Sequence, residues 1–398
     1  MQTPKHIHDA VRNTLRSLGR NLTTPQVRTV KEILVGLLRN STTILNHLNT
    51  EADIRIGKQS ERYRRHLENI DITALVEKHI FRTLPEVEED TIIAYDLGDI
   101  AKPHAKVMEG VHPIFDGSER KSSRGYELHG VSIHNQPVVM ELHDADAKFL
   151  PQVREEIIDR ITAKIGTKSI WVYDRGNDDE KLFMAHVRRK QRFIVRLKKN
   201  RNLIHRKSGM TQKVEAFLPG IYDVRVPKHR WKYTLVVHEH IEAEQEQEPI
   251  RVLVRGVEAK KAEKIIETYL RRWDIENIYK QMKEKFGLEE IRLLSMKKVK
   301  NLLALIQLST SISNRAFAEM TEEAEEESTA IFELTITFKA FCHKRCLTRN
   351  RFAFTSFLSE YSPLFQPRER EENPFQRSLL PRREIRRLER ETAEMGVC

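Results

Sequence analysis

The sequence predicts an α/β protein with a mixed sheet, helices on both faces, a β-rich insertion and a helical region at its start. Two short apolar runs, at 91–96 and 169–174, each end on an aspartate, which is typical of strands in an α/β sheet. Between them, two extended runs around an Asn-Gln pair indicate an antiparallel hairpin. A helical pattern at 153–165 then leads to the second aspartate run. Parallel and antiparallel neighbours are therefore both expected.

Residues 1–90 are predicted to form a helical N-terminal region. Thr24 is placed as a helix cap and Pro25 at the first helical position, and apolar residues then recur along one stripe. Basic residues gather over 58–65. The region is interpreted either as a module that recognises DNA ends or as a solvated helical bundle. The stripe contains Val27, Val30, Ile33, Leu34, Leu37 and Leu38, and the basic group includes Arg62, Arg64 and Arg65.

Residues 91–197 are predicted to form the first part of a catalytic core. The hairpin strands are expected over 126–134 and 137–143, with Asn135 and Gln136 between them. Helices over 153–165 and 179–189 are expected to alternate with strands over 169–174 and 193–197. A ribonuclease-H-like core has this order of elements.

The rest of the chain is divided by changes in the hydrophobic period. Residues 198–256 contain short β-like runs between polar segments with Gly and Pro, and are predicted to be a β-rich insertion. Residues 257–320 return to helical patterns, over 260–285 and 299–317, and are expected to complete the core. Residues 321–398 are predicted to be a helical, basic C-terminal region, with a solvated or partly disordered end as the alternative. Its basic stripe contains Arg382, Arg383, Arg386, Arg387 and Arg390.

Length and charge limit the class of protein. A chain of 398 residues predicts two or three structural units, and a net charge of +11 favours contact with a polyanion, although an inert basic surface is the alternative. The first twenty residues lack the apolar stretch of a secretion signal, and no run is long enough to span a membrane. We therefore expect a cytoplasmic protein.

The three cysteines suit a reducing compartment. Cys342, His343 and Cys346 lie close together in the sequence, as in some zinc sites, but no second pair of ligands follows at the required spacing. We interpret them as ordinary helix residues, and Cys398 has no partner predicted.

Asp96 and Asp174 each follow an apolar run, and strand ends are where side chains emerge from a rigid sheet into a crevice. If the two strands are neighbours, their carboxylates lie close together and repel each other. Two Mg²⁺ ions would relieve this repulsion, because hard cations prefer carboxylate oxygens. The alternative for either residue is a turn former or a helix cap.

A third group of residues is predicted on one helix face. At about 100° per residue, Tyr269, Arg272, Glu276 and Lys283 fall within an arc of ~60°. A carboxylate flanked by two cations and a phenol suits a nucleic-acid end held in a metal site. An exposed face with favourable ion pairs is the structural alternative.

The spacing Tyr-x2-Arg-x3-Glu-x6-Lys resembles the signature of the insertion-sequence-four family of bacterial DDE transposases. The segments around Asp96 (Tyr-Asp-Leu-Gly-Asp-Ile-Ala-Lys) and Asp174 (Val-Tyr-Asp-Arg-Gly-Asn-Asp) are similar to the same family. The resemblance covers roughly 91–300 in the correct order, including the insertion between the second Asp and the Glu. One departure is Leu97-Gly98, where a small hydroxyl residue is commoner after the Asp.

The resemblance implies a DNA transposase with cut-and-paste activity. Asp96, Asp174 and Glu276 would be the catalytic, metal-binding triad, holding two Mg²⁺ ions for which Mn²⁺ can substitute. Tyr269, Arg272 and Lys283 would contact phosphates of double-stranded DNA at the terminal inverted repeats, and target DNA would enter the same site. The resemblance also implies a homodimer in the synaptic complex and a bacterial, nucleoid-associated protein.

Two alternatives to this function remain at the level of the sequence. One is a metal-dependent nuclease of the same fold that performs no strand transfer. The other is a DNA-binding derivative of a transposase that performs no catalysis. Within the insertion, Trp231 is the candidate for an aromatic residue that holds a flipped base, as some family members have.

Overall fold

The computed structural model describes residues 5–48, 56–116, 121–242 and 245–322, and part of 338–360, namely 338, 341, 342, 345, 347, 348 and 350–360. The predicted basic stripe of the C-terminal region lies outside the described residues, as do His343, Cys346 and Cys398. Cys342 is described and is buried. A search of the described helices finds none with the length and hydropathy of a membrane span.

The centre of the molecule is a mixed sheet of eleven strands. Its order is β2-β3-β1-β5-β6-β11-β10-β9-β7-β8, with β4 paired to β3. β1, β5 and β6 are parallel, whereas the other pairs are antiparallel. The predicted α/β class with a mixed sheet is therefore confirmed. The strands are β1 (Ile92–Ala101), β2 (His112–Asp116), β3 (Lys121–Ile133), β4 (Gln136–Leu142), β5 (Ile170–Tyr173), β6 (Arg192–Arg196), β7 (Asn202–His205), β8 (Thr211–Lys213), β9 (Gly220–Arg225), β10 (Tyr233–Glu242) and β11 (Gln245–Arg255).

Helices cover both faces of the parallel part of the sheet. Successive residues of a strand point to opposite faces. Trp171 and Tyr173 accordingly belong to the apolar cluster that includes α5 (Leu150–Ile165) and α6 (Glu180–Arg188), whereas Val172 belongs to the cluster that includes α7 (Ala262–Leu270). Burial on both sides explains why this strand is an unbroken apolar run.

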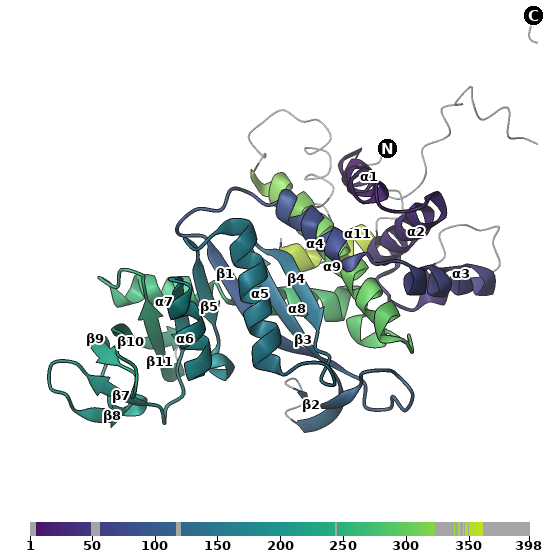
Figure 1. The fold of residues 1–398 in the computed structure, drawn as a ribbon. Helices are drawn as coiled ribbons and strands as arrows, with labels where there is room; N and C mark the ends of the chain where they lie inside the picture. Colours follow the sequence, from purple (N-terminus) through teal and green to yellow (C-terminus); the bar gives the residue numbers. More distant parts are fainter. Residues whose placement is uncertain are drawn as a thin grey trace, which may run out of the picture.

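The N-terminal helices pack against a long helix, α9 (Met296–Glu322), which contacts β4, and the last of them, α4, also contacts β4. Figure 1 shows these helices and the strands β7–β10 at opposite ends of the molecule, with the core sheet between them. The remaining helices are α1 (Lys5–Gly19), α2 (Thr24–Asn40), α3 (Ile56–Asn69), α4 (Thr73–Arg82), α8 (Trp273–Phe286) and α11 (Arg351–Glu360).

Several predicted boundaries were wrong. The N-cap of α2 is Thr23 rather than Thr24, because the Thr23 N–H donates to the Gln26 side chain at 2.8 Å in a capping box. β1 does not end at Asp96, because its pairing with β3 continues as far as Ala101. β2 was not predicted. The hairpin turn at His134 and Asn135 has positive φ at both residues, which is the backbone of a two-residue type I′ connection.

The predicted long helix over 260–285 is two helices. A tight turn at Arg271 and Arg272 separates α7 from α8, and there the backbone bonds span three residues instead of four, from Arg272 N to Tyr269 O and from Ile275 N to Arg272 O. The turn contains no Pro or Gly, so the sequence pattern gives no sign of it. It allows α7 to cover the middle of the sheet while α8 crosses β1 and β3.

Helix α8 approaches the sheet closely at two glycines. The Tyr279 hydroxyl contacts the carbonyl oxygens of Asp96, at 2.9 Å, and Leu128, at 3.0 Å. A Cβ on Gly130 would lie 2.7 Å from Cζ of Tyr279, and a Cβ on Gly98 would lie 2.9 Å from the same atom. Neither contact is possible without movement of the backbone or the ring, so both strand positions require glycine.

We predict that Gly130→Ala destabilises the protein by about 1–3 kcal/mol, because the added methyl group overpacks the contact between α8 and β3. Urea denaturation followed by circular dichroism measures the change in the free energy of unfolding. Gly57→Ala is the matched control, because nothing lies within 4 Å of a Cβ at this position in α3 and alanine favours the helix by up to ~1 kcal/mol. Equal stability of the two variants would contradict the prediction.

Candidate active site

Asp96 and Asp174 lie side by side on neighbouring strands. In the parallel pair of β1 and β5, the last partners are Tyr95 and Tyr173, and each aspartate is the next residue. Neighbouring strands are about 4.8 Å apart, so the two carboxylates share one edge of the sheet. Burial, together with the negative charge of Asp174, raises the pKa of Asp96 to about 7. The strand pairing therefore creates the crowding of like charges that the sequence predicts.

Hydrogen bonds hold the Asp174 carboxylate in one orientation. Its oxygens accept from Gly176 N at 2.9 Å and from Asn177 Nδ2 at 2.7 Å. The buried Asn177 side chain in turn accepts from Nη1 of Arg154 in α5, at 3.2 Å. Arg154 is anchored by an ion pair with Asp179, at 2.7 Å. Asp174 thus also caps the short 3-10 turn that follows it, so the alternative of a helix cap describes part of its role.

Glu276 reaches the same edge of the sheet because α8 is fixed by Tyr279, one turn further along the helix. Arg272 lies between Glu276 and Asp96, with its guanidinium 2.5 Å from Oε1 of Glu276 and 3.6 Å from Oδ2 of Asp96. Its side chain is only 6% exposed. The buried guanidinium of Arg272 therefore contacts one carboxylate from β1 and one from α8, so Asp96 and Glu276 both lie next to it.

Arg272 also has unused hydrogen-bonding capacity. Its Nε and Nη1 atoms are buried and make no hydrogen bond. Leaving a buried charged donor without a partner is unfavourable, and such groups occur where a ligand is expected to complete them. A phosphate oxygen is the natural acceptor for a guanidinium in a site of this kind.

The three acids can hold divalent cations if Asp96 bridges them. The carboxylate oxygens of the three acids are not all within 4.8 Å of one another. Among the described residues, potential metal ligands lie that close together in a different group of side chains. A pair of metal ions does not need such a set, because each ion could be held by a different pair of these acids. The all-oxygen donor set suits Mg²⁺ or Mn²⁺.

The other predicted site residues occupy different surroundings. Tyr269 is 2% exposed and packs in the cluster under α7, with the Arg272 guanidinium 5.8 Å from its ring centre. Lys283 is paired with Asp99 at 3.1 Å and with Glu289 at 2.9 Å, and its side chain is 24% exposed. Only Arg272 of the three lies between the acids. Trp231 is partly buried, with the guanidinium groups of Arg230 and Arg255 near its ring.

The sequence analysis missed two residues that position the acids. Asn177 stands three residues after Asp174, a spacing at which a side-chain bond to an Asp at a turn is common, so local chemistry could have suggested it. Tyr279 stands three residues after Glu276, so the two side chains are neighbours on the surface of α8. Its contact with Gly98 and Gly130 joins distant segments, and no pattern in one sequence predicts it.

We predict that the apo protein, in EDTA, loses stability as the pH rises from about 4 to 7. The Asp96 carboxyl releases its proton near pH 4 in the unfolded chain and near pH 7 in the folded protein, so the folded state binds more protons between these values. Urea denaturation across this range measures the decline. Asp96→Asn should make it shallower, whereas Asp90→Asn, at an exposed position, should leave it unchanged. An equal slope in all three proteins would refute the prediction.

Comparison with known families identifies the chain. A family model described as "Transposase DDE domain" matches residues 88–312, which is more than half of the sequence and contains all three acids. No curated protein matches the chain. The chain therefore belongs to the transposase DDE domain family, whose members are ribonuclease-H-like, divalent-metal-dependent enzymes that act on DNA.

Proposed function

We propose that this protein is a cut-and-paste transposase of the insertion-sequence-four type, which cleaves DNA at the transposon ends and joins them to target DNA. The observation that supports this best is that Arg272 contacts Asp96 and Glu276, with Asp174 on the strand next to Asp96, while the Nε and Nη1 atoms of Arg272 make no hydrogen bond. Three acids and an incompletely bonded guanidinium suit a phosphodiester better than a neutral substrate.

In this proposal, Asp96, Asp174 and Glu276 would hold two Mg²⁺ ions, for which Mn²⁺ can substitute. When bound, the cations supply activation of the attacking oxygen and stabilisation of the leaving oxygen. Asn177 and Arg154 keep Asp174 in place, and Tyr279 keeps Glu276 at the sheet edge. Arg272 orients the scissile phosphate through its free donors.

The proposed reaction has two displacements at phosphorus. Water attacks the phosphodiester at the end of the element, the P–O bond to the 3′ oxygen breaks, and a 3′-hydroxyl is released. That hydroxyl then attacks a phosphodiester of target DNA in the same site. The P–O bond to the 3′ oxygen of the target strand breaks, a target 3′-hydroxyl is released, and the element is joined to the 5′ side of the cut. No side chain becomes covalently attached to DNA. Because both ends must be cut together, we expect a homodimer in the synaptic complex.

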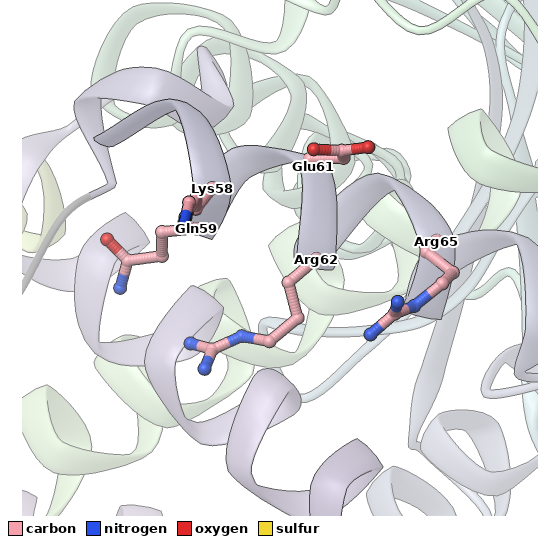
Figure 2. Close-up of a pocket in the computed structure, with 5 residues that line it drawn as sticks. All are labelled: Lys58, Gln59, Glu61, Arg62 and Arg65. Atoms are coloured by element: carbon pink, nitrogen blue, oxygen red, sulfur yellow. The ribbon is translucent and has the colours of Figure 1, made fainter. Parts of the chain in front are cut away.

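The N-terminal helices offer a basic surface for the terminal inverted repeats. Figure 2 shows Arg62 and Arg65 extending in the same direction from α3, around a pocket that Lys58, Gln59 and Glu61 also line. Arg62 has a structural role as well, because it is paired with the buried Glu32 of α2. Arg65 and its neighbour Arg64 are exposed and available for phosphates. The proposal assigns end recognition to this surface, with a cytoplasmic protein acting at the nucleoid.

We predict that Asp174→Asn and Glu276→Gln each reduce cleavage of DNA with terminal inverted repeats on the order of a thousandfold or more, because each removes a metal ligand while keeping the size of the side chain. Cleavage is measured with Mg²⁺ on labelled duplexes. Asp90→Asn should cleave normally. Normal cleavage by either active-site variant would exclude the proposed site.

A second assay separates transposition from simple nuclease activity. When the wild-type protein receives ends that are already cleaved, we expect joined products with target DNA. Cleavage of uncut ends without any joined product would instead identify a nuclease. Binding of the ends without metal-dependent nicking would identify a DNA-binding protein that performs no catalysis.

We predict that Arg64→Ala combined with Arg65→Ala weakens binding to the inverted repeats and lowers the slope of log K against log salt by about 2, since each arginine that contacts a phosphate contributes about 1. Electrophoretic mobility shifts at several salt concentrations give the slope. Arg188→Ala is the matched control, because Arg188 is 61% exposed on α6. An unchanged slope in the double variant would place end recognition elsewhere.

A further inference from the structure

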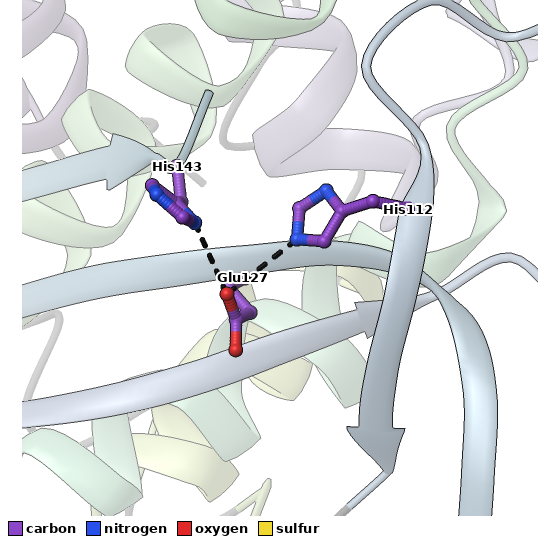
Figure 3. A group of neighbouring side chains, drawn as sticks. All are labelled: His112, Glu127 and His143. Carbon is purple, nitrogen blue, oxygen red and sulfur yellow. Dashed lines mark hydrogen bonds and ion pairs between the residues drawn. The ribbon is translucent and has the colours of Figure 1, made fainter. Parts of the chain in front are cut away.

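Two histidines and a glutamate converge at a place that the transposition reaction does not use. His112 from β2, Glu127 from β3 and His143 just after β4 each direct a possible ligand atom to one point, and these atoms all lie within 4.8 Å of one another. His143 Nδ1 is 3.1 Å from Oε2 of Glu127, and His112 Nε2 is 3.5 Å from the same oxygen. Figure 3 shows both rings turned towards the carboxylate, from separate segments of the chain.

The outer nitrogen of each ring is already used. His112 Nδ1 is 3.0 Å from the carbonyl oxygen of Gly110, and His143 Nε2 is 2.7 Å from that of Lys148. A carbonyl can only accept, so both outer nitrogens carry the proton and donate. In the neutral rings, the inner nitrogens then present lone pairs to the carboxylate. Backbone carbonyls that fix the tautomer in this way are the usual outer partners of metal-binding histidines.

The distances from Glu127 to the two histidine nitrogens suit a tetrahedral ion, and the two nitrogens lie within 4.8 Å of each other. Ligands about 2.0–2.1 Å from Zn²⁺ lie about 3.3 Å apart, and the two distances to Glu127 are 3.1 and 3.5 Å. Two histidines and one carboxylate form a common ligand set for Zn²⁺, with a fourth position for water. The side chains are shielded but reachable, since His143 is 6%, His112 18% and Glu127 27% exposed.

The cluster is separate from the catalytic acids. Gly130 lies beneath Tyr279 on the face of the sheet that α8 covers. Glu127 is three residues earlier in the same strand, so its side chain points to the opposite face. His129, two residues from Glu127, faces the same way and contacts the Tyr95 hydroxyl at 2.7 Å, while its ring meets that of His143 edge-on.

We propose that His112, Glu127 and His143 form a second metal site, which binds one Zn²⁺ ion or a similar transition metal through three protein ligands. The ion would join β2, the middle of β3 and the segment that leads from β4 into α5. β2 is the edge strand on this side of the sheet, and a bound metal would link it to β3 and to the segment after β4. The competing arrangement is a protonated His143 paired with Glu127, which would bind no metal.

The test uses the full-length protein, free of any affinity tag, with Asp96→Asn, Asp174→Asn and Glu276→Gln to suppress binding at the catalytic acids. Co²⁺ is titrated while its visible absorption is recorded, and Zn²⁺ is then added in competition. We expect about one equivalent of Co²⁺ with the intense bands of a tetrahedral site, displaced by Zn²⁺. We also expect Zn²⁺, but not Mg²⁺, to raise the melting temperature.

His112→Ala and Glu127→Gln are each added to this background, and each should abolish the Co²⁺ bands and the Zn²⁺-dependent rise in melting temperature. His104→Ala is the matched control, because His104 is exposed and should leave one equivalent bound. Circular dichroism verifies that every variant is folded. Failure of the parent to bind Co²⁺ and Zn²⁺, or full binding by His112→Ala and Glu127→Gln, would overturn the proposal. Because no catalytic step is measured, the result is independent of the proposed transposition activity.

Discussion

The close contact between α8 and the sheet is the constraint on which the proposed catalytic site depends. Glu276 belongs to a helix that is far along the chain from both aspartates, and it meets them only because the Tyr279 ring lies directly on β1 and β3. Gly98 and Gly130 leave the space for that ring. Packing therefore requires glycine at position 98 in this chain, since a larger residue there would displace the helix that carries Glu276.

Electrostatic balance is the second requirement of this site. Adjacent strands bring Asp96 and Asp174 together, and burial makes their charges more costly. Arg272 offsets part of that cost by contacting Asp96 and Glu276, while Asn177 and Gly176 donate to Asp174. The site is thus organised before any metal or DNA arrives, which limits the rearrangement needed on binding.

The sequence predicted what depends on short-range pattern. The apolar runs before Asp96 and Asp174, the two hairpin strands and the helices α5 and α6 follow from local periodicity, and they were enough to identify the sheet and place the two aspartates. The turn between the hairpin strands lies at His134 and Asn135, one residue before the predicted Asn135 and Gln136. The break between α7 and α8 was not predictable, because Arg271 and Arg272 are compatible with a continuous helix and only tertiary contacts select the turn. The assignment of Tyr269 and Lys283 to DNA phosphates stays a prediction. Tyr269 is buried between α7 and the sheet, and Lys283 is paired with Asp99 and Glu289. The helical spacing of these residues in the sequence could not show either contact.

Strands β7–β11 belong to the same sheet as β1, β5 and β6, and this limits how they can move. The last four residues of β11, Val252 to Arg255, pair with β6, and β6 pairs with β5, the strand that leads to Asp174. Hydrogen bonds between strands resist sliding, so β7–β10 are held to the core by the sheet and not only by loops. A force applied to these strands, for example by DNA in the proposed function, would therefore be transmitted through β11, β6 and β5 to Asp174.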